Sequence, residues 1–302
     1  MANLGFALRS TVFSAPETIA VTRLLDGKTA PFRVFIPDGR TGPEAMEIAS
    51  SILGASKNLH VGSGVIRLLE HDANLLVRRI ETLQAFSTNR FFLGIGTGSP
   101  GSEPGESVTR MLERLGQVKK MFHSFTRGIE PPQIFVAALK QGIARRAVYM
   151  ANGLLFNFCS PNHAMRLIEQ VKPEASEKTE YACYLKIFYS SRDNVTAKRL
   201  LVQEFLNYDS TSQYHEMFVQ DGIADIIKQF AKDEKWKKQD FDLPDALLTI
   251  SLANAVHDQL KDYVESYRKA GVMIPVVYPY FPQDEKSEFK METMKDILHV
   301  LT

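Results

Sequence analysis

The amino-acid sequence predicts an α/β protein built as a closed (β/α)8 barrel, also called a TIM barrel. Eight short apolar runs occur along the 302 residues, and most are followed by a segment with the period of an amphipathic helix. Several runs are apolar at consecutive positions, which is typical of strands buried on both faces of a parallel sheet. Strands that alternate with helices in this way favour a closed barrel over an open sheet. The sequence contains no internal repeat or linker, so residues 1–302 are expected to form one domain.

The eight predicted strands follow one another along the whole chain. In order they are LGFAL (4–8), FRVFIP (32–37), NLHVGSGV (58–65), RFFLGIG (90–96), QIFVAAL (133–139), GLLFNF (153–158), YACYLKIFY (181–189) and VMIPVVYPY (272–280). Pro275 and Pro279 interrupt the last of these runs, which leaves its limits open.

Helices are predicted where apolar residues recur on one face of a 3.6-residue period. Three such faces are Leu76, Ile80 and Leu83; then Val108, Met111, Leu112, Leu115 and Phe122; then Val256, Leu260, Tyr263, Val264 and Tyr267. Pro16, Pro43 and Pro161 stand near helix starts, where a missing N–H costs little, and Ser160 is placed to cap the helix that follows it. Residues 191–270 hold no convincing strand, so extra helices are expected between the seventh and eighth strands.

Composition and charge exclude several classes of partner. The formal net charge is +1, which gives no electrostatic reason to expect nucleic acid or an anionic membrane. The sequence lacks an apolar run long enough to span a membrane and shows no secretory signal at its start. The two cysteines, Cys159 and Cys183, lack metal-binding spacing and are expected to be reduced thiols in a cytoplasmic protein.

The stretch RFFLGIGTGSPG (90–101) places Gly96, Gly98 and Gly101 in the spacing of a dinucleotide-binding loop. That motif needs a tight turn into a helix and a second strand ending in an acidic residue about 20 residues later. Here Pro100 and Pro104 lengthen the loop, and about 20 residues on the chain is still helical. The alternative places Gly94, Gly96 and Gly98 at the carboxyl end of the fourth barrel strand, where enzymes of this fold bind ligands. A third interpretation is that the glycines only relieve crowding.

Four segments of the sequence resemble the luciferase-like monooxygenase superfamily, and they follow one another along the chain in the order of that family's strands and helices. They are FRVFIPD (32–38), VGSGVIRLLEHDANLLVRRIETLQAFSTNRFFLGIGTG (61–98), PPQIFVAALKQGIARRAVYMANGLLFNFCSP (131–161) and LKDYVESYRKAGVMIPVVYP (260–279). Within the superfamily, NGLLFNFCSP most resembles the methylenetetrahydromethanopterin reductase branch, which uses the deazaflavin coenzyme F420 rather than FMN. The sequence departs from the family where Asp72 follows His71 and where Asn152-Gly153 replaces Asp-Gly. These departures and the compact loops leave the substrate class open.

The resemblance implies a set of cofactor-binding residues. Ser63, Gly64 and Val65 would form a bulge on the third strand that supports the ring, with a cis peptide bond between Gly64 and Val65. Gly96, Thr97 and Gly98 would line the ring and its side chain. The remaining positions would be Ala137, Ala138 and Gly142 near the phosphate, and Asn157, Cys159 and Ser160 beside the tail.

Asp38 and Arg67 are the charged candidates near this expected site. Asp38 ends the second strand, where it is either a catalytic carboxylate or part of a Pro-Asp-Gly turn. Arg67 would neutralise a coenzyme phosphate or stay solvated. The sequence shows neither a metal-binding cluster nor a G-x-S-x-G elbow, so no metal is expected and a hydrolase triad has no support.

The function implied by the resemblance is that of an oxidoreductase. Coenzyme F420 would exchange a hydride with a small organic substrate, in a homodimer as is common in the family. One alternative is an FMN-dependent monooxygenase with a flavin reductase as partner. A second alternative is a non-catalytic barrel that binds flavin, or nothing, without turnover.

Overall fold

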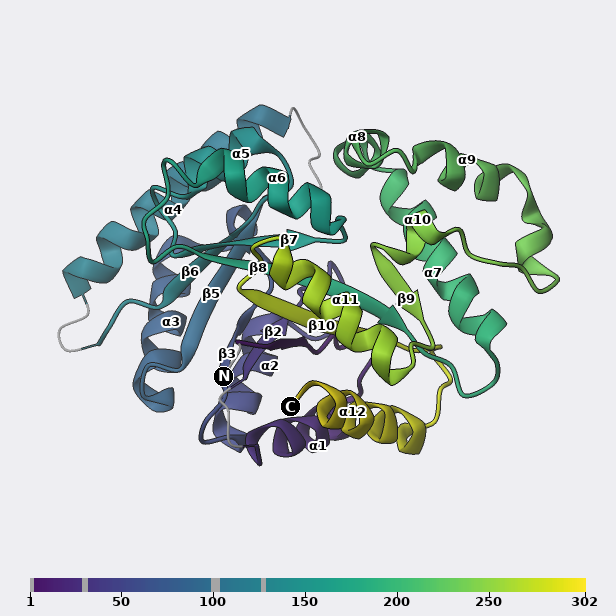
Figure 1. The fold of residues 1–302 in the computed structure, drawn as a ribbon. Helices are drawn as coiled ribbons and strands as arrows, with labels where there is room; N and C mark the ends of the chain where they lie inside the picture. Colours follow the sequence, from purple (N-terminus) through teal and green to yellow (C-terminus); the bar gives the residue numbers. More distant parts are fainter. Residues whose placement is uncertain (1–2, 29–31, 99–103, 126–128) are drawn as a thin grey trace.

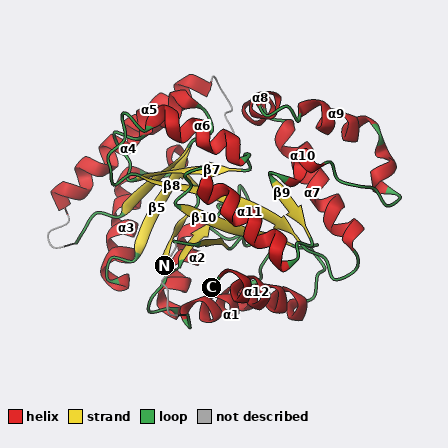
Figure 2. Cartoon of the chain, in the orientation of Figure 1, coloured by secondary structure: helices red, strands yellow, loops and turns green. Residues whose placement is uncertain are grey.

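The computed structural model describes residues 3–28, 32–98, 104–125 and 129–302, and shows a barrel of parallel strands surrounded by helices (Figures 1 and 2). Its strands are β1 (Gly5–Ala7), β2 (Arg33–Ile36), β3 (His60–Ser63), β4 (Ile66–Arg67), β5 (Phe91–Gly96), β6 (Gln133–Ala137), β7 (Gly153–Asn157), β8 (Glu180–Phe188), β9 (Ser251–Ala253) and β10 (Ile274–Tyr280).

The helices lie on the outside of the strands. They are α1 (Ala15–Asp26), α2 (Ala45–Ala55), α3 (Ala73–Ser87), α4 (Pro104–Phe125), α5 (Gln141–Ala147), α6 (Pro161–Val171), α7 (Asn194–Asp209), α8 (Ser212–Gln220), α9 (Ala224–Lys232), α10 (Asp245–Leu248), α11 (His257–Lys269) and α12 (Ser287–Leu301). Two short 3₁₀ turns occur at Leu68–Glu70 and Glu234–Lys237. In Figure 1 the first helix, α1, lies beside the last, α12.

The sheet closes because β10 pairs in parallel with both β1 and β8. The order around the barrel is β1, β2, β3, β5, β6, β7, β8 and β10, so eight parallel strands form the ring. All eight runs predicted from the sequence contain one of these strands, and the closed (β/α)8 barrel is confirmed. Strand β10 runs through Pro275 and Pro279 without a break.

One prediction about the insertion is wrong. Residues 191–270 contain α7 to α10, as expected, but they also contain strand β9. Ser251, Leu252 and Ala253 pair in parallel with Lys186, Ile187 and Phe188, which lie beyond the part of β8 that pairs with β7. The inserted helices, at the upper right of Figure 1, therefore return to the barrel through a short strand at its carboxyl end.

The hydrophobic core has two parts. One fills the barrel interior and is rich in aromatic rings; its buried members are Ala7, Phe35, Phe92, Phe135, Leu155, Ala182, Tyr184, Ile274, Val276 and Tyr278. The centroid of the Phe35 ring lies 4.6 Å from that of Phe92, a distance typical of packed aromatic pairs. The other part lies between strands and helices and contains the predicted apolar helix faces, except that Val256 precedes α11 and is 61% exposed.

Local capping chemistry sets several helix starts. The Ser160 hydroxyl accepts a hydrogen bond from His163 N at 3.0 Å, so the predicted cap of α6 is confirmed. Asp72, one of the departures from the family pattern, caps α3 by accepting from Leu75 N at 2.9 Å. Asn152, the other, accepts from Ile134 N at 2.9 Å and joins β6 to the start of β7. Both departures therefore have a local structural role.

Candidate active site at the barrel rim

The carboxyl ends of the eight parallel strands meet at one end of the barrel, and this rim carries the candidate site. Side chains alternate along a strand, so the inward-facing row continues upward from the interior core described above. That row divides into two parts. The small-residue half consists of Val65, Gly94, Gly96, Gly98 and Ala137, and the polar half consists of Arg9, Asn157, Lys186, Tyr278 and Tyr280.

In the small-residue half, Gly94 and Gly96 of β5, and Gly98 just after it, each pack against one residue of the β3–β4 segment. A Cβ atom added at Gly94 would lie 2.1 Å from the Ser63 carbonyl oxygen, and one at Gly96 would lie 2.8 Å from a Val65 methyl group. At Gly98, where φ is +73°, a Cβ would lie 2.5 Å from Cδ of Arg67. The three glycines thus give the β3–β4 segment room to approach, which favours the crowding interpretation. Gly101, the end of the glycine motif, lies outside the described residues.

The β3–β4 segment is fixed tightly in place. The Gly64–Val65 peptide bond is cis, as the resemblance implies. The Ser63 hydroxyl accepts a hydrogen bond from Gly94 N at 3.0 Å and donates one to Gly94 O at 2.8 Å. The Tyr184 hydroxyl, inside the barrel, donates to Gly64 O. Val65 and Thr97 stay partly exposed above this framework, so a flat ligand could lie against them.

Asp38 and Arg67 form an ion pair, with 3.3 Å between Asp38 Oδ2 and Arg67 Nη2. Arg67 also binds the Glu70 carboxylate at 2.7 Å and donates to Gly39 O at 3.1 Å. The other oxygen of Asp38 accepts from Ala45 N at the start of α2, at 3.4 Å. Arg67 is therefore paired with two carboxylates rather than solvated. Asp38 lies in the turn and also contacts this charged group.

The polar half is organised around Lys186, whose side chain is completely buried. Its Nζ lies 2.5 Å from Glu204 Oε1 of α7 and donates to the Tyr208 hydroxyl at 2.8 Å. Aromatic rings surround the same ammonium group: its nitrogen lies 4.1 Å from the Tyr208 ring centroid and 4.8 Å from that of Phe158. A buried ammonium group with a carboxylate, a phenol and ring faces as partners is a fully compensated charge.

Burial and neighbouring charges act in opposite directions on this pair. Burial alone would lower the pKa of Lys186, but the Glu204 carboxylate and the Tyr208 and Tyr278 phenols outweigh it and raise the pKa. Burial would likewise raise the pKa of Glu204, but Lys186, and to a smaller extent Arg9, lower it. Both groups are therefore charged at neutral pH.

Asn157 lies where the two halves meet. Its side-chain nitrogen donates to the Tyr208 hydroxyl at 3.1 Å and to the Tyr214 hydroxyl at 2.5 Å. Its side-chain oxygen is buried, and no described residue bonds to it. An acceptor without a protein partner is a specific place for a ligand donor.

Ala137, Ala138 and Gly142 lie around the turn from β6 into α5. Next to this turn is a cleft of about 200 Å³, lined by Leu139, Lys140 and Gln141 and by side chains of α6 and α8. Gly142 is exposed, and a Cβ added there would meet nothing within 4 Å. Gly142 is thus beside open space, as a role near a phosphate requires, whereas Ala138 is only 2% exposed.

Cys159 and Ser160 are less available. The Cys159 side chain is completely buried in the outer core, with its sulfur 3.9 Å from that of Cys183. The Ser160 hydroxyl is engaged as the cap of α6. Their side chains lie away from the inward-facing row, so only their backbone could border a ligand.

Apart from Asn157, sequence reasoning missed the polar half. Lys186 is the one charged residue within the apolar run YACYLKIFY, and that exception was a usable signal. Its partner Glu204 lies 18 residues further along the chain, on an inserted helix. Arg9 comes directly after the first strand, and its Nη1 donates to the Tyr280 hydroxyl at 3.2 Å.

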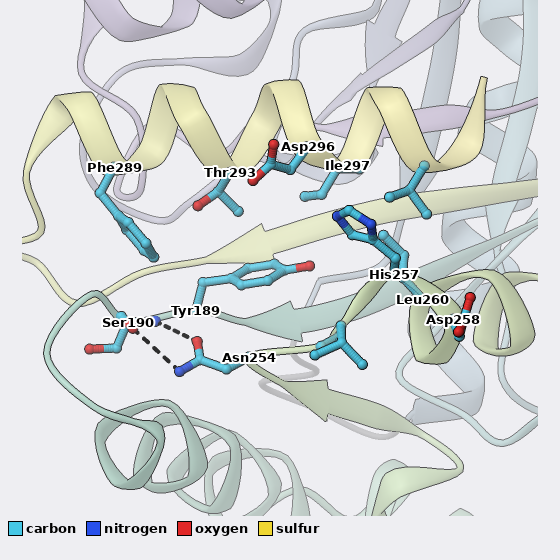
Figure 3. A pocket seen from close by; sticks show the side chains of 13 residues that line it. Tyr189, Ser190, Asn254, His257, Asp258, Leu260, Phe289, Thr293, Asp296 and Ile297 are labelled. Atoms are coloured by element: carbon cyan, nitrogen blue, oxygen red, sulfur yellow. Dashed lines mark hydrogen bonds between the residues drawn. The ribbon is translucent and has the colours of Figure 1, made fainter.

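A separate cleft of about 650 Å³ lies outside the barrel, between α12, the start of α11 and the residues that follow β8 and β9. Figure 3 shows Phe289, Thr293 and Ile297 of α12 on one side of it, with Tyr189 and His257 nearby. Asn254 bridges to Ser190 there, accepting from Ser190 N at 2.9 Å. None of the site residues predicted from the sequence lines this cleft.

Metal-binding clusters and membrane-spanning helices are both absent from the described part of the chain. No group of three or more His, Cys, Asp or Glu side chains within it is placed to hold a metal ion. No helix within it combines the length and apolar character needed to cross a bilayer.

The fold has clear relatives among solved structures. An F420-dependent secondary alcohol dehydrogenase, solved with an F420-acetone adduct, aligns with a TM-score of 0.75 at 11% identity, covering 100% of this chain and 99% of that one. The coenzyme F420 dependent tetrahydromethanopterin reductase from Methanopyrus kandleri aligns with a TM-score of 0.67 at 15% identity, covering 100% and 99%. The oxygenating constituent of 3,6-diketocamphane monooxygenase from Pseudomonas putida, in complex with FMN, has a TM-score of 0.62 at 15% identity, covering 98% and 96%.

Identity at this level shows the fold alone. No curated protein sequence matches the chain. The model of the luciferase-like monooxygenase family matches residues 32–273, which is most of the barrel. With that match and the closed parallel barrel, the chain belongs to the luciferase-like monooxygenase family.

Proposed function

We propose that this protein is a coenzyme F420-dependent oxidoreductase that transfers a hydride between the deazaflavin ring and a small organic substrate. The observation that carries the proposal is the β3–β4 segment, which the Ser63–Gly94 hydrogen bonds hold at the rim beside a row of glycines. The F420-dependent structures to which the chain is similar support the choice of coenzyme.

The residues present fit such a group on two counts. Val65, Thr97, Gly98 and Ala137 are small and partly exposed, so they leave room for a flat ring. Asn157 adds a buried side-chain oxygen that lacks a described protein partner. When bound, coenzyme F420 supplies a carbon centre, C5, that accepts or gives a hydride.

The protein's own part is to bind, to orient and to exclude water. In the proposal, Ser63, Gly64 and Val65 support one face of the ring, while Gly96, Thr97 and Gly98 line it. Asn157 orients the ligand through its free acceptor, with the backbone of Cys159 and Ser160 beside the tail. Ala137, Ala138 and Gly142 border the phosphate, next to the cleft that contains Lys140 and Gln141.

Asp38 has a supporting role in this proposal. Its two oxygens contact Arg67 and the start of α2, and the side chain is only 7% exposed. A general base must reach the proton that it takes. Asp38 is thus assigned to hold Arg67 and the β2–α2 turn, as a positioning residue.

Titration of the purified protein with coenzyme F420 and, separately, with FMN tests the proposal through quenching of cofactor fluorescence. Coenzyme F420 is expected to bind, and Gly96→Ala is expected to weaken binding because the new methyl group displaces Val65. The matched control is Gly54→Ala on the outer helix α2, where an added Cβ meets nothing within 4 Å. Tight FMN binding without a response to coenzyme F420 would contradict the choice of coenzyme.

The second candidate is an FMN-dependent monooxygenase, which would need a flavin reductase as partner. The structure solved with FMN favours it, because its barrel aligns with this chain over nearly the whole length. A third candidate, a barrel without turnover that binds flavin or no cofactor at all, is favoured by the engagement of Asp38 and by the filled polar half. Failure to bind either cofactor would support the third candidate over the other two.

A homodimer in the cytoplasm remains part of the proposal. Phe86 and Leu75, on the outward side of α3, are 89% and 51% exposed, which is compatible with a subunit contact there. Light scattering after size-exclusion chromatography measures the mass directly and would contradict the dimer if it gave 34 kDa, the mass of one chain.

A further inference from the structure

The polar half of the rim carries more positive than negative charge. The charged groups that act on one another there are Arg9, Lys186 and Glu204. Burial raises the pKa of the Tyr278 and Tyr280 phenols above its ordinary value, so both remain neutral. Two cations and one carboxylate leave a net charge of +1 among these residues.

The excess charge can be assigned to Arg9. Lys186 already has the Glu204 carboxylate at 2.5 Å and the Tyr208 hydroxyl at 2.8 Å. Arg9 makes one side-chain hydrogen bond, to the Tyr280 hydroxyl, and no described carboxylate lies within 4.0 Å of it. A guanidinium group has five N–H donors, so most of its donor capacity is unused by described residues.

Arg9 is also within reach of a ligand. It follows β1 at the rim and is partly exposed, as is Tyr280 beside it. By contrast, Lys186 is completely buried below them. A ligand that enters the rim would therefore meet the guanidinium group before it met the ammonium group.

We propose that Arg9 binds the carboxylate of a monoanionic organic substrate, so that the enzyme acts on small organic acids. The planar guanidinium matches a carboxylate through two parallel hydrogen bonds, and one negative charge neutralises the excess at the rim. The dianion of a phosphate monoester carries more charge than this half can balance. The inference rests on the proposed function, because it names the substrate class for the same rim.

Acetate binding to the cofactor-free protein tests the inference, with affinity measured by titration calorimetry at constant ionic strength. Acetamide has nearly the same shape without the charge, and inorganic phosphate is the alternative oxyanion. Acetate is expected to bind more tightly than both. Arg9→Gln is expected to weaken acetate binding about tenfold or more, since a charged hydrogen bond is lost. Arg78→Gln, on the exposed side of α3, is the matched control and should leave acetate affinity unchanged.

A second measurement needs no variant. Phenylglyoxal modifies accessible arginines, and peptide mass spectrometry reports which ones. Acetate is expected to slow the modification of Arg9 but not that of Arg78, whereas equal rates with and without acetate would contradict the site.

Three outcomes would overturn the inference: equal affinity for acetate and acetamide, unchanged acetate binding by Arg9→Gln, or tighter binding of phosphate than of acetate. All these measurements omit the cofactor, and the cofactor titration omits acetate. Failure of one proposal is therefore distinguishable from failure of the other.

Discussion

The two halves of the rim solve different packing problems. In the small-residue half, Gly94, Gly96 and Gly98 have no room for a side chain, because an added Cβ would meet the Ser63 backbone or the side chains of Val65 and Arg67. In the polar half, large side chains from the strands and from α7 fill the space and must satisfy one another, as Lys186 and Glu204 do. One half therefore gains its shape from glycines packed closely against the β3–β4 segment, and the other from paired charges.

The largest expected effect is in the polar half. Lys186→Met leaves the Glu204 carboxylate buried without its cation, which should lower the free energy of unfolding by about 3 kcal/mol or more. Removing both charges in Lys186→Met/Glu204→Gln should restore much of the loss. Urea denaturation measures all three proteins. If the single and double variants were equally unstable, packing rather than charge would hold this half together.

A smaller effect is expected in the small-residue half. Gly94→Ala forces its methyl group against the Ser63 carbonyl oxygen, which should cost about 1–3 kcal/mol of stability. The same denaturation experiment on Gly54→Ala, which adds a methyl group in open space within a helix, should show no loss. Equal stability of the two variants would mean that the β3–β4 segment yields easily, contrary to the comparison.

Asp38→Asn sharpens the comparison at the edge of the small-residue half. The substitution keeps the shape but weakens the contact with Arg67, so it should cost about 1 kcal/mol of stability. The rate of hydride transfer in single-turnover experiments should change little. A loss of about 100-fold or more would instead identify Asp38 as a general base.

The smallest expected effect is a loss of folding stability in mild acid. The lowered pKa of Glu204 keeps its carboxylate charged in mild acid, so a loss of stability at this pH should come from groups outside the polar half. Burial lowers the pKa of His163, against the opposing influence of the Leu139 carbonyl and Asp221. The native state then binds fewer protons than the unfolded state, and stability should fall as pH drops below about 6.5. Urea midpoints between neutral and mildly acidic pH should show this slope, and His163→Gln should reduce it, the remainder coming from His60, whose pKa burial also lowers.

Hydrophobic pattern was enough to predict the barrel but not every strand. Eight buried parallel strands leave long apolar runs, and each predicted run contains a barrel strand. Strand β9 spans only Ser251–Ala253 and pairs with the part of β8 that extends past β7, a contact that local pattern does not show. Val256 fitted an apolar helix face but lies just before α11, where the face has not begun.

The site was less predictable than the fold, for a physical reason. The glycines are visible in the sequence, but the residues that they pack against, at positions 63, 65 and 67, are 31 positions away. The sequence therefore does not show why the glycines recur at every second position. The ion pair of Lys186 with Glu204 depends on how α7 crosses the rim. Local periodicity contains no information on either contact. The family resemblance did supply the cis bond at Gly64–Val65, which the structure confirms.

The packing of residues 94, 96 and 98 against residues 63, 65 and 67 also has a consequence for sequence variation and for engineering. A bulkier residue on one segment requires a compensating change on the other, so the six positions are expected to vary together among homologues. Anyone who reshapes this entrance would have to exchange both segments as one cassette.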